Sequence, residues 1–138
     1  MSESHRTAFS DWDLELEFGE NGEHWVRDFI GDNTVEVKSS RYFLQPDTRY
    51  GGRQLAFIEF ACRGRDGKWR DSGIRTTKAR GWVIRFGDLP GGLLVDVAWL
   101  RRAYRLAFER GQFQRNDKEP NPTRGVLVGL DELWQTRP

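Results

Sequence analysis

Apolar and polar residues alternate in three segments of the chain, and this alternation predicts β-strands. In residues 34–40, Val35 and Val37 face one way, while the threonine, glutamate and lysine side chains between them face the other. Two further strands are expected over residues 54–62 and 81–86. All three end at glycine-containing or polar segments, which are typical of turns.

A second pattern predicts helices. In residues 93–109, apolar residues recur at steps of four, three, four and four, as on one face of an α-helix. Residues 19–30 predict a shorter helix, and residues 76–79 suit a single helical turn. A last short strand is expected over residues 126–128, while residues 12–18 predict either an edge strand or an extended lead-in.

The chain shows no internal repeat and no low-complexity linker. Its 138 residues lie within the usual size of one domain, about 100–200 residues. We therefore expect a single domain over residues 1–138, with residues 1–10 as a loose arm. The mixed order of helices and strands predicts an α/β fold class, as an α+β sandwich, and excludes a helical bundle or an all-β barrel.

Composition narrows the class of protein further. The longest apolar run, residues 91–95, is far shorter than the roughly 20 residues that span a bilayer, so no membrane partner is expected. The first six residues hold no apolar segment, which argues against a secretory signal. One cysteine, Cys62, and two histidines exclude a zinc cluster of these residues. A reducing cytoplasm is the expected compartment.

Charge is unevenly distributed along the chain. Residues 1–40 hold three basic and ten acidic groups, a net −7, whereas residues 41–115 hold sixteen basic and seven acidic groups, a net +9. Eighteen of the 22 basic residues are arginine, which binds phosphate with two parallel hydrogen bonds. Solvated arginines alone would explain this composition. Acidic metal ligands acting on a polyanion would explain it equally well.

The segment with the most chemical information is Glu36-Val37-Lys38. On a strand, this spacing places a carboxylate and an ammonium on the same face, about 6–7 Å apart. The carboxylate can hold Mg²⁺, and the lysine can orient a metal-bound water or stabilise charge on phosphorus. The alternative is that both side chains serve solubility on a half-exposed strand.

A second carboxylate, Glu59, lies among apolar residues of the next predicted strand. If the two strands form a hairpin that pairs Lys38 with Phe57, Glu36 lies opposite Glu59. Facing carboxylates about 5 Å apart repel each other unless a cation lies between them. In a different register, Glu59 would point to solvent beside an arginine.

Three more acidic residues are candidate ligands. Glu23 begins the helix of residues 19–30, where a carboxylate is favoured by the helix N-terminus alone. Asp32 lies in the turn before the Glu36 strand, and it reaches the same site only if the turn folds it back. Asp28, one helical turn earlier, competes with Asp32 for this role.

Candidate contacts to nucleic acid lie in the basic middle of the chain. The glycine-containing loop over residues 63–70 could follow a phosphate backbone, with Trp69 stacked on a base. The alternative is a surface loop that Trp69 anchors. Hydroxyls after this loop could donate to phosphate or only cap their own turn. The candidate residues are Arg63, Arg65, Ser72, Thr76, Thr77 and Lys78.

Taken together, these motifs resemble the PD-(D/E)XK nuclease superfamily, and in particular small phage and bacterial endonucleases of that class. The matching segments are Gly22-Glu23, residues 34–39 around Glu36-Val37-Lys38, residues 57–60 around Glu59, Arg63-Gly64, residues 72–79 and residues 122–128. Two positions depart from the pattern. The usual aspartate before E-x-K has no clean counterpart, so Asp32, Asp28 and Glu59 compete for it, and Arg80 stands where an acidic residue is expected.

The resemblance implies a restriction-endonuclease-like core, a central mixed β-sheet flanked by helices. It also implies a DNA endonuclease dependent on Mg²⁺ or Mn²⁺ that is structure-selective, like Holliday-junction resolvases, and works as a symmetric homodimer. The implied metal ligands are Glu23, Glu36, one of Asp32 or Glu59, and the Val37 carbonyl, while Lys38 would position the attacking water. The alternative is a catalytically inactive nuclease fold that binds nucleic acid or serves as a phage accessory interaction protein.

Overall fold

The structure is a computed structural model that describes residues 20–28, 30–31, 35–43, 48–117 and 120–138. By its internal contacts the chain divides into two units, residues 1–34 and residues 35–138. In the first unit, residues 20–28 and 30–31 are helical, which confirms the described part of the helix predicted over residues 19–30. The predictions for residues 1–10 and 12–18, and the position of Asp32, lie outside the described residues.

The second unit contains a three-stranded mixed sheet. Strand β1, Val35–Ser40, runs parallel to β4, Gly81–Phe86, and β4 pairs antiparallel with β5, Gly92–Asp96. The order across the sheet is β1-β4-β5. Because parallel neighbours need a long crossover, the residues between β1 and β4 have room to form part of a second sheet.

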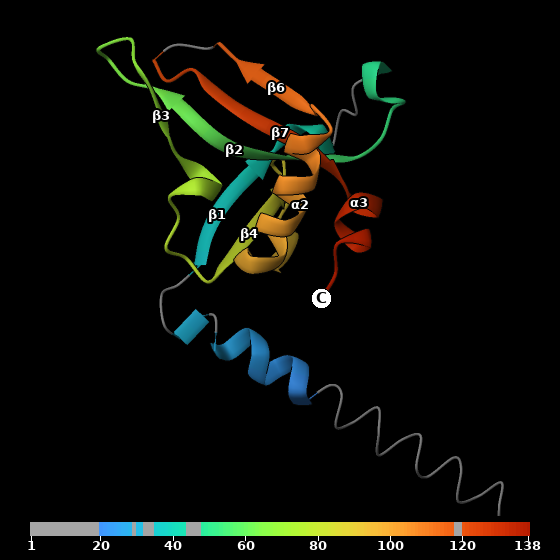
Figure 1. Cartoon of the computed structure of the whole chain (residues 1–138). Helices are drawn as coiled ribbons and strands as arrows, with labels where there is room; N and C mark the ends of the chain where they lie inside the picture. The colour runs from blue at the N-terminus through green and yellow to red at the C-terminus, as the bar shows by residue number, and fades with distance from the viewer. Residues whose placement is uncertain (1–19, 29, 32–34, 44–47, 118–119) are drawn as a thin grey trace, which may run out of the picture. The chain divides into compact units, whose positions relative to one another are not determined.

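The second sheet has four strands, all antiparallel, in the order β3-β2-β7-β6 (Figure 1). Its strands are β2, Leu55–Arg63; β3, Trp69–Asp71; β6, Phe113–Asn116; and β7, Thr123–Gly129. The pairing of β2 with β7 is irregular between Glu59 and Ala61, where Phe60 is an extra residue in a β-bulge.

Helix α2, Val97–Glu109, begins at Asp96, whose carboxylate accepts a hydrogen bond from the Ala98 amide at 2.7 Å. The short helix α3, Leu130–Gln135, lies beside it, and the Trp99 indole donates to the Leu133 carbonyl at 2.8 Å (Figure 1). Single 3₁₀ turns are η1, Arg41–Phe43; η2, Thr48–Tyr50; and η3, Gly73–Arg75.

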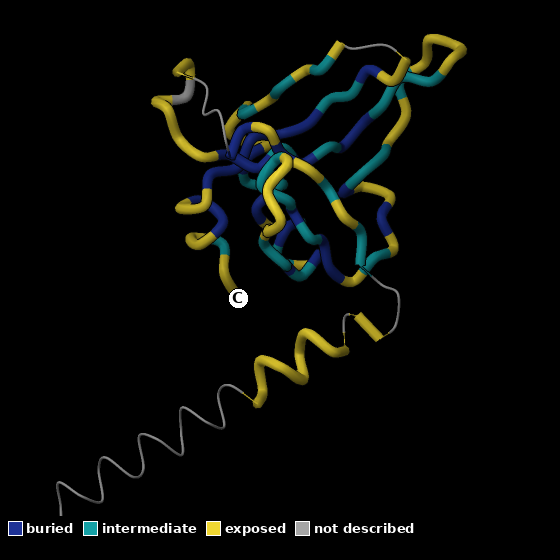
Figure 2. The backbone as a smooth tube through the Cα atoms, turned by 180° about the vertical axis from the view of Figure 1, so that it is seen from behind, coloured by how far each residue is buried: buried dark blue, intermediate teal, exposed yellow. Residues whose placement is uncertain are grey.

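The core lies where the two sheets meet helix α2. Ile58 of β2, Trp82 of β4, Leu100 of α2 and Val126 of β7 are all 1% exposed or less and belong to one cluster. In Figure 2 the buried residues are concentrated in the strands and helices that pack together, while most of the described loop residues are exposed. The Arg53 guanidinium, just before β2, donates hydrogen bonds to Glu132 and Asp131 of α3, each at 2.6 Å, and so links the start of β2 to this helix.

The coarse fold prediction, a mixed α+β sandwich, is confirmed, with two sheets where one central mixed sheet was expected. The hairpin of residues 34–40 with residues 54–62 is wrong, because β1 pairs with β4 and β2 pairs with β3 and β7. The helix predicted over residues 93–109 begins only at Val97, since the apolar residues before it form β5. The helical turn predicted over residues 76–79 lies earlier, in η3.

Candidate functional site

The E-x-K segment forms a solvent-reachable ion pair on β1. Lys38 Nζ lies 3.3 Å from Glu36 Oε2, so the two side chains meet on one face of the strand. Their side chains are 37% and 41% exposed, respectively. Lys38 Nζ also lies 5.1 Å from the centroid of the Trp82 ring, a distance at which a cation is attracted to the ring face. The indole therefore holds the ammonium beside the carboxylate.

The charged side chains of β1 lie on the side opposite to the one expected if they served only solubility. Glu36 is in register with Trp82 and Lys38 with Ile84, and in-register residues of parallel strands project to the same side. Trp82 and Ile84 are 1% and 2% exposed, so this is the core side, whereas Val37 on the other side is 61% exposed. A strand with one side on the core normally buries its valines and exposes its charged side chains. Because β1 has Glu36 and Lys38 on its core side and Val37 on its outer side, a functional role for the charged pair is favoured over a role in solubility.

Glu59 belongs to a different environment from the one predicted. It lies opposite Gly125 of β7, and its Oε2 accepts a hydrogen bond from the Ser72 hydroxyl at 2.7 Å. The expected pairing of Glu36 opposite Glu59 is wrong, because β1 and β2 belong to separate sheets. Glu59 stays a predicted ligand, but its position is set by Ser72.

The Ser72-Gly73 segment is held against β2 by a close backbone approach. The Ser72 amide donates to the Phe60 carbonyl at 2.9 Å, and Gly73 has a φ of +53°. A Cβ at position 73 would overlap the Glu59 carbonyl oxygen and lie 2.8 Å from its carbonyl carbon. Only glycine therefore fits here, and it allows the next residue, Ile74, to be buried.

Three of the predicted nucleic-acid contacts follow Gly73, and they differ in how far they are exposed. Thr76 and Lys78 are exposed, but Thr77 is only 8% exposed. The Thr77 hydroxyl oxygen accepts from the Ala79 amide at 3.2 Å and from the Trp82 indole at 3.4 Å. This burial gives Thr77 an interior role and corrects its assignment to a phosphate-facing surface.

The basic loop between β2 and β3 is anchored by contacts of Trp69 and Arg70, the first two residues of β3. Asp66 forms an ion pair with Arg70, and this hydrogen bond lowers the pKa of Asp66 to about 2. Trp69 is half-buried, and the Arg124 guanidinium lies 4.0 Å from the centroid of its ring. Trp69 thus anchors the loop, the second of the two alternatives. Arg65 is exposed and Arg63 is half-buried.

The other predicted metal ligands are placed as follows. Glu23 and Asp28 are exposed on the helical residues 20–28, and Glu23 Oε2 lies 3.5 Å from Arg27 Nη2. Within the parts of the chain that the structure describes, no group of three or more histidine, cysteine, aspartate and glutamate residues comes together as a metal site. The Glu36 carboxylate and the Val37 carbonyl are oxygen donors of the kind that Mg²⁺ prefers.

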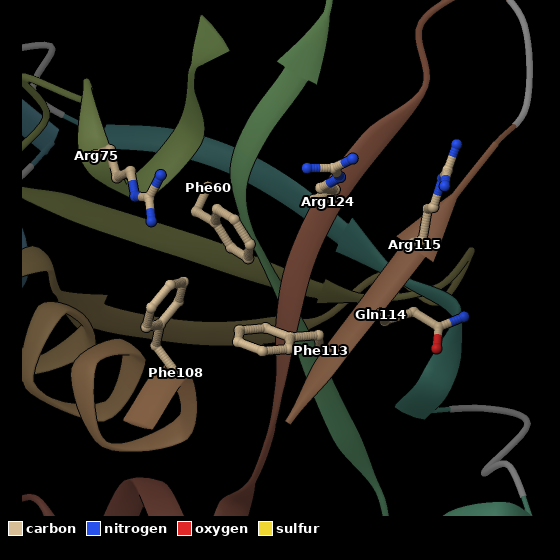
Figure 3. Close-up of a pocket in the computed structure, with 7 residues that line it drawn as sticks. All are labelled: Phe60, Arg75, Phe108, Phe113, Gln114, Arg115 and Arg124. Carbon is tan, nitrogen blue, oxygen red and sulfur yellow. The ribbon is translucent and has the colours of Figure 1, made fainter. Parts of the chain in front are cut away.

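A feature that the sequence analysis missed is a pocket of about 530 Å³ at one end of the core. Its lining comes from five separate elements, β2, η3, α2, β6 and β7, so no local motif marks it. Figure 3 shows three phenylalanine rings gathered between one arginine on one side and two on the other. We call it the arginine–phenylalanine pocket; its lining residues are Phe60, Arg75, Phe108, Phe113, Gln114, Arg115 and Arg124.

Comparison of the chain with protein-family models, with curated proteins and with solved structures found no match. None of the helices in the described residues has the length and apolar character needed to cross a lipid bilayer.

Proposed function

We propose that this protein is a metal-dependent DNA endonuclease that hydrolyses phosphodiester bonds, built on a restriction-endonuclease-like core. One observation carries the proposal: β1 presents a paired carboxylate and ammonium, Glu36 and Lys38, on its core side while Val37 is exposed. Both side chains are less than half exposed, so each has given up part of its contact with water. A catalytic role for the pair would account for this placement.

The chemical roles follow from the two groups. Glu36 and the Val37 carbonyl would hold Mg²⁺ or Mn²⁺, and Glu23, Asp32 and Glu59 stay predicted ligands. When bound, the ion would supply an activated water and offset charge on the phosphate. Lys38, held 5.1 Å from the Trp82 ring centroid, can donate to that water or to a phosphate oxygen. In-line attack would leave a 5′-phosphate and a 3′-hydroxyl.

Charge supports a polyanionic substrate. Residues 41–115 carry a net charge of +9, and the exposed Arg65, Thr76 and Lys78 lie in this part of the chain. DNA is therefore the proposed partner. A symmetric homodimer acting in the cytoplasm of a bacterium or a phage-infected cell completes the proposal, with a branched junction as the preferred substrate.

The test is cleavage of labelled four-way junction, flap and linear duplex DNA in Mg²⁺ and in Mn²⁺, with EDTA as the blank. Glu36→Gln and Lys38→Met should each slow cleavage about 100-fold or more while DNA binding survives. Asp131→Asn is the matched control, since it removes the carboxylate of another exposed ion pair, the one with Arg53, and should leave cleavage unchanged.

Two results would contradict the proposal. If the wild type cuts none of these DNAs in either metal but still retards them, the protein is a binding module on a nuclease-like fold. If Glu36→Gln and Lys38→Met cut as fast as the wild type, a cleaving activity exists but lies elsewhere in the chain.

A further inference from the structure

We propose that the arginine–phenylalanine pocket binds an unpaired nucleotide segment of DNA. The inference rests on the proposed function and deepens it, because it assigns single-stranded or partly unpaired DNA as the substrate class. The pocket does not include Glu36 or Lys38, so it is a binding site separate from the E-x-K pair.

Three aromatic rings of the pocket lie against one another, and two of them are open to water. Phe108 and Phe113 are in contact, with ring centroids 5.0 Å apart, yet they are 37% and 48% exposed. Phe60 forms the floor, 5.5 Å from Phe108 and 6.1 Å from Phe113 by ring centroid, and is only 7% exposed. Adjacent aromatic rings left open to water on a small soluble domain mark a surface that a ligand covers. The face of a nucleobase is a suitable cover.

Two arginines beside the rings are held in place by neighbouring side chains. The Arg75 guanidinium lies 4.6 Å from the Phe60 centroid and donates to the Tyr104 hydroxyl at 2.7 Å and to Asp71 at 2.9 Å. These contacts fix the guanidinium plane at the pocket wall. On the opposite side, the Arg124 guanidinium lies over the Trp69 ring, 4.0 Å from its centroid. Both cations are thus held in place before a ligand arrives, which lowers the entropic cost of binding.

Aromatic rings with arginines on either side suit a ligand that has both a flat base and phosphate groups. Figure 3 shows the rings of Phe60, Phe108 and Phe113 lying between Arg75 and Arg124, so a base stacked on a ring would place its flanking phosphates toward the cations. A volume of about 530 Å³ admits a nucleotide. Bases inside a duplex already have both faces stacked, so only an unpaired base can use the rings.

The β-bulge at Phe60 explains how β2 contributes to this wall. Ala61 pairs with Arg124 of β7 and Phe60 has no partner in that register, yet both residues are only 7% exposed. A bulge turns a side chain away from the regular alternation of the strand. Phe60 therefore reaches Arg75 and Phe108 while Ala61 keeps the pairing with Arg124.

The experiment measures binding by fluorescence anisotropy in EDTA, where cleavage cannot occur. The probes are a short labelled oligothymidylate and a duplex of the same length, each titrated at several NaCl concentrations. We expect the oligothymidylate to bind more tightly than the duplex. Phe113→Leu, which keeps an apolar side chain but removes the ring, should weaken its binding about 10-fold without changing the salt dependence.

Arg124→Gln should act differently from Phe113→Leu. It removes one phosphate contact, so the slope of log K against log [NaCl] should become shallower by about 0.7. The matched controls are Trp134→Leu and Arg137→Gln, which alter another exposed aromatic–arginine pair, 5.0 Å apart at α3 and outside the pocket. Both should bind like the wild type, and thermal unfolding should show that all variants are folded.

The outcomes separate this inference from the nuclease proposal. If the wild type cuts DNA but binds both probes equally, and the pocket variants behave like the controls, the pocket assignment is overturned and the nuclease stands. If the pocket variants lose oligothymidylate binding but no DNA is ever cut, the nuclease is overturned and the pocket stands. If polyglutamate displaces the probe as well as unlabelled oligothymidylate does, the pocket recognises acidic chains and not nucleotides.

Discussion

The close approach of η3 to β2 can be tested with two glycines that differ in one respect. Gly73 and Gly67 both have a positive φ, +53° and +77°. A Cβ at position 67 meets nothing within 4 Å, whereas a Cβ at position 73 overlaps the Glu59 carbonyl. Gly67→Ala therefore measures backbone strain alone, and Gly73→Ala measures the same strain together with the close contact.

The magnitudes follow from the geometry. Alanine in a left-handed conformation costs about 1–2 kcal/mol. At Gly73, the new Cβ would also lie 2.8 Å from the Glu59 carbonyl carbon, where ordinary contact begins at 3.4 Å. Relieving this overlap shifts η3 and the buried Ile74, which costs about 2 kcal/mol more. We expect Gly73→Ala to lose about 3–4 kcal/mol of the free energy of unfolding and Gly67→Ala about 1 kcal/mol.

The assay is thermal unfolding followed by circular dichroism. For a unit of this size, each 1 kcal/mol lowers Tm by about 4–8 °C, so Gly73→Ala should lower Tm by about 15 °C and Gly67→Ala by about 5 °C. Equal losses for the two variants would refute the close approach. Because η3 also carries Arg75, Gly73→Ala should weaken oligothymidylate binding at a temperature where the protein is folded, and Gly67→Ala should not.

Three further predictions concern stability and titration. Glu132→Gln removes a largely buried carboxylate that accepts from Arg53 at 2.6 Å, and should cost about 2–3 kcal/mol in urea unfolding. Leu100→Ala, at a fully buried site in α2, should cost about 3 kcal/mol by the same measurement. Arg70→Gln should raise the pKa of Asp66 from about 2 toward 3.8 in an NMR titration; because the folded pKa is the lower one, the wild type loses this stabilisation as pH falls from 3.8 toward 2.

Each of these has a result that contradicts it. A Glu132→Gln variant as stable as wild type would mean that Arg53 is satisfied without that carboxylate. A loss under 1 kcal/mol for Leu100→Ala would place the residue outside the tightly packed core. If the Asp66 pKa were the same in wild type and in Arg70→Gln, the ion pair would not be formed in solution.

The strands could be predicted from the sequence because their pattern is local. Residues 81–86 match β4, and residues 34–40 and 54–62 match β1 and β2 within one residue at each end. Alternation along one strand shows which residues share a side, and that information does not depend on the partner strand. It does not show which side faces the core, because in β1 the side of Glu36 and Lys38, and not that of Val37, lies toward Trp82 and Ile84.

The pairing of strands could not be predicted in the same way. The hairpin prediction failed because alternation within residues 34–40 does not identify a partner, and β4 lies far along the chain. The start of α2 was placed too early because the apolar residues of β5 continue the helical spacing. Asp96, a good N-cap residue, was the overlooked signal for the true start.

Of the two candidate sites, one is formed by residues close in the sequence and the other by residues far apart. The Glu36–Lys38 pair was found because both members lie on one strand at a spacing of two. The arginine–phenylalanine pocket was missed because Arg75, Phe108 and Arg124 meet only after the two sheets and α2 have packed. Its sequence signal is faint, because Phe60 lies in a predicted strand and Phe108 on the predicted apolar face of a helix, where both are expected to be core residues.

The bulge at Phe60 also limits how this chain can change in length. Before it, Ala56 and Ile58 face the core; after it, the core-facing position passes to Ala61, and Cys62 is paired with Thr123. Deleting the extra residue would restore regular pairing of β2 with β7. The pocket wall would then lose the side chain that Phe60 now contributes. Insertions and deletions in relatives of this chain should therefore gather in the loop after β2 and spare the strand itself.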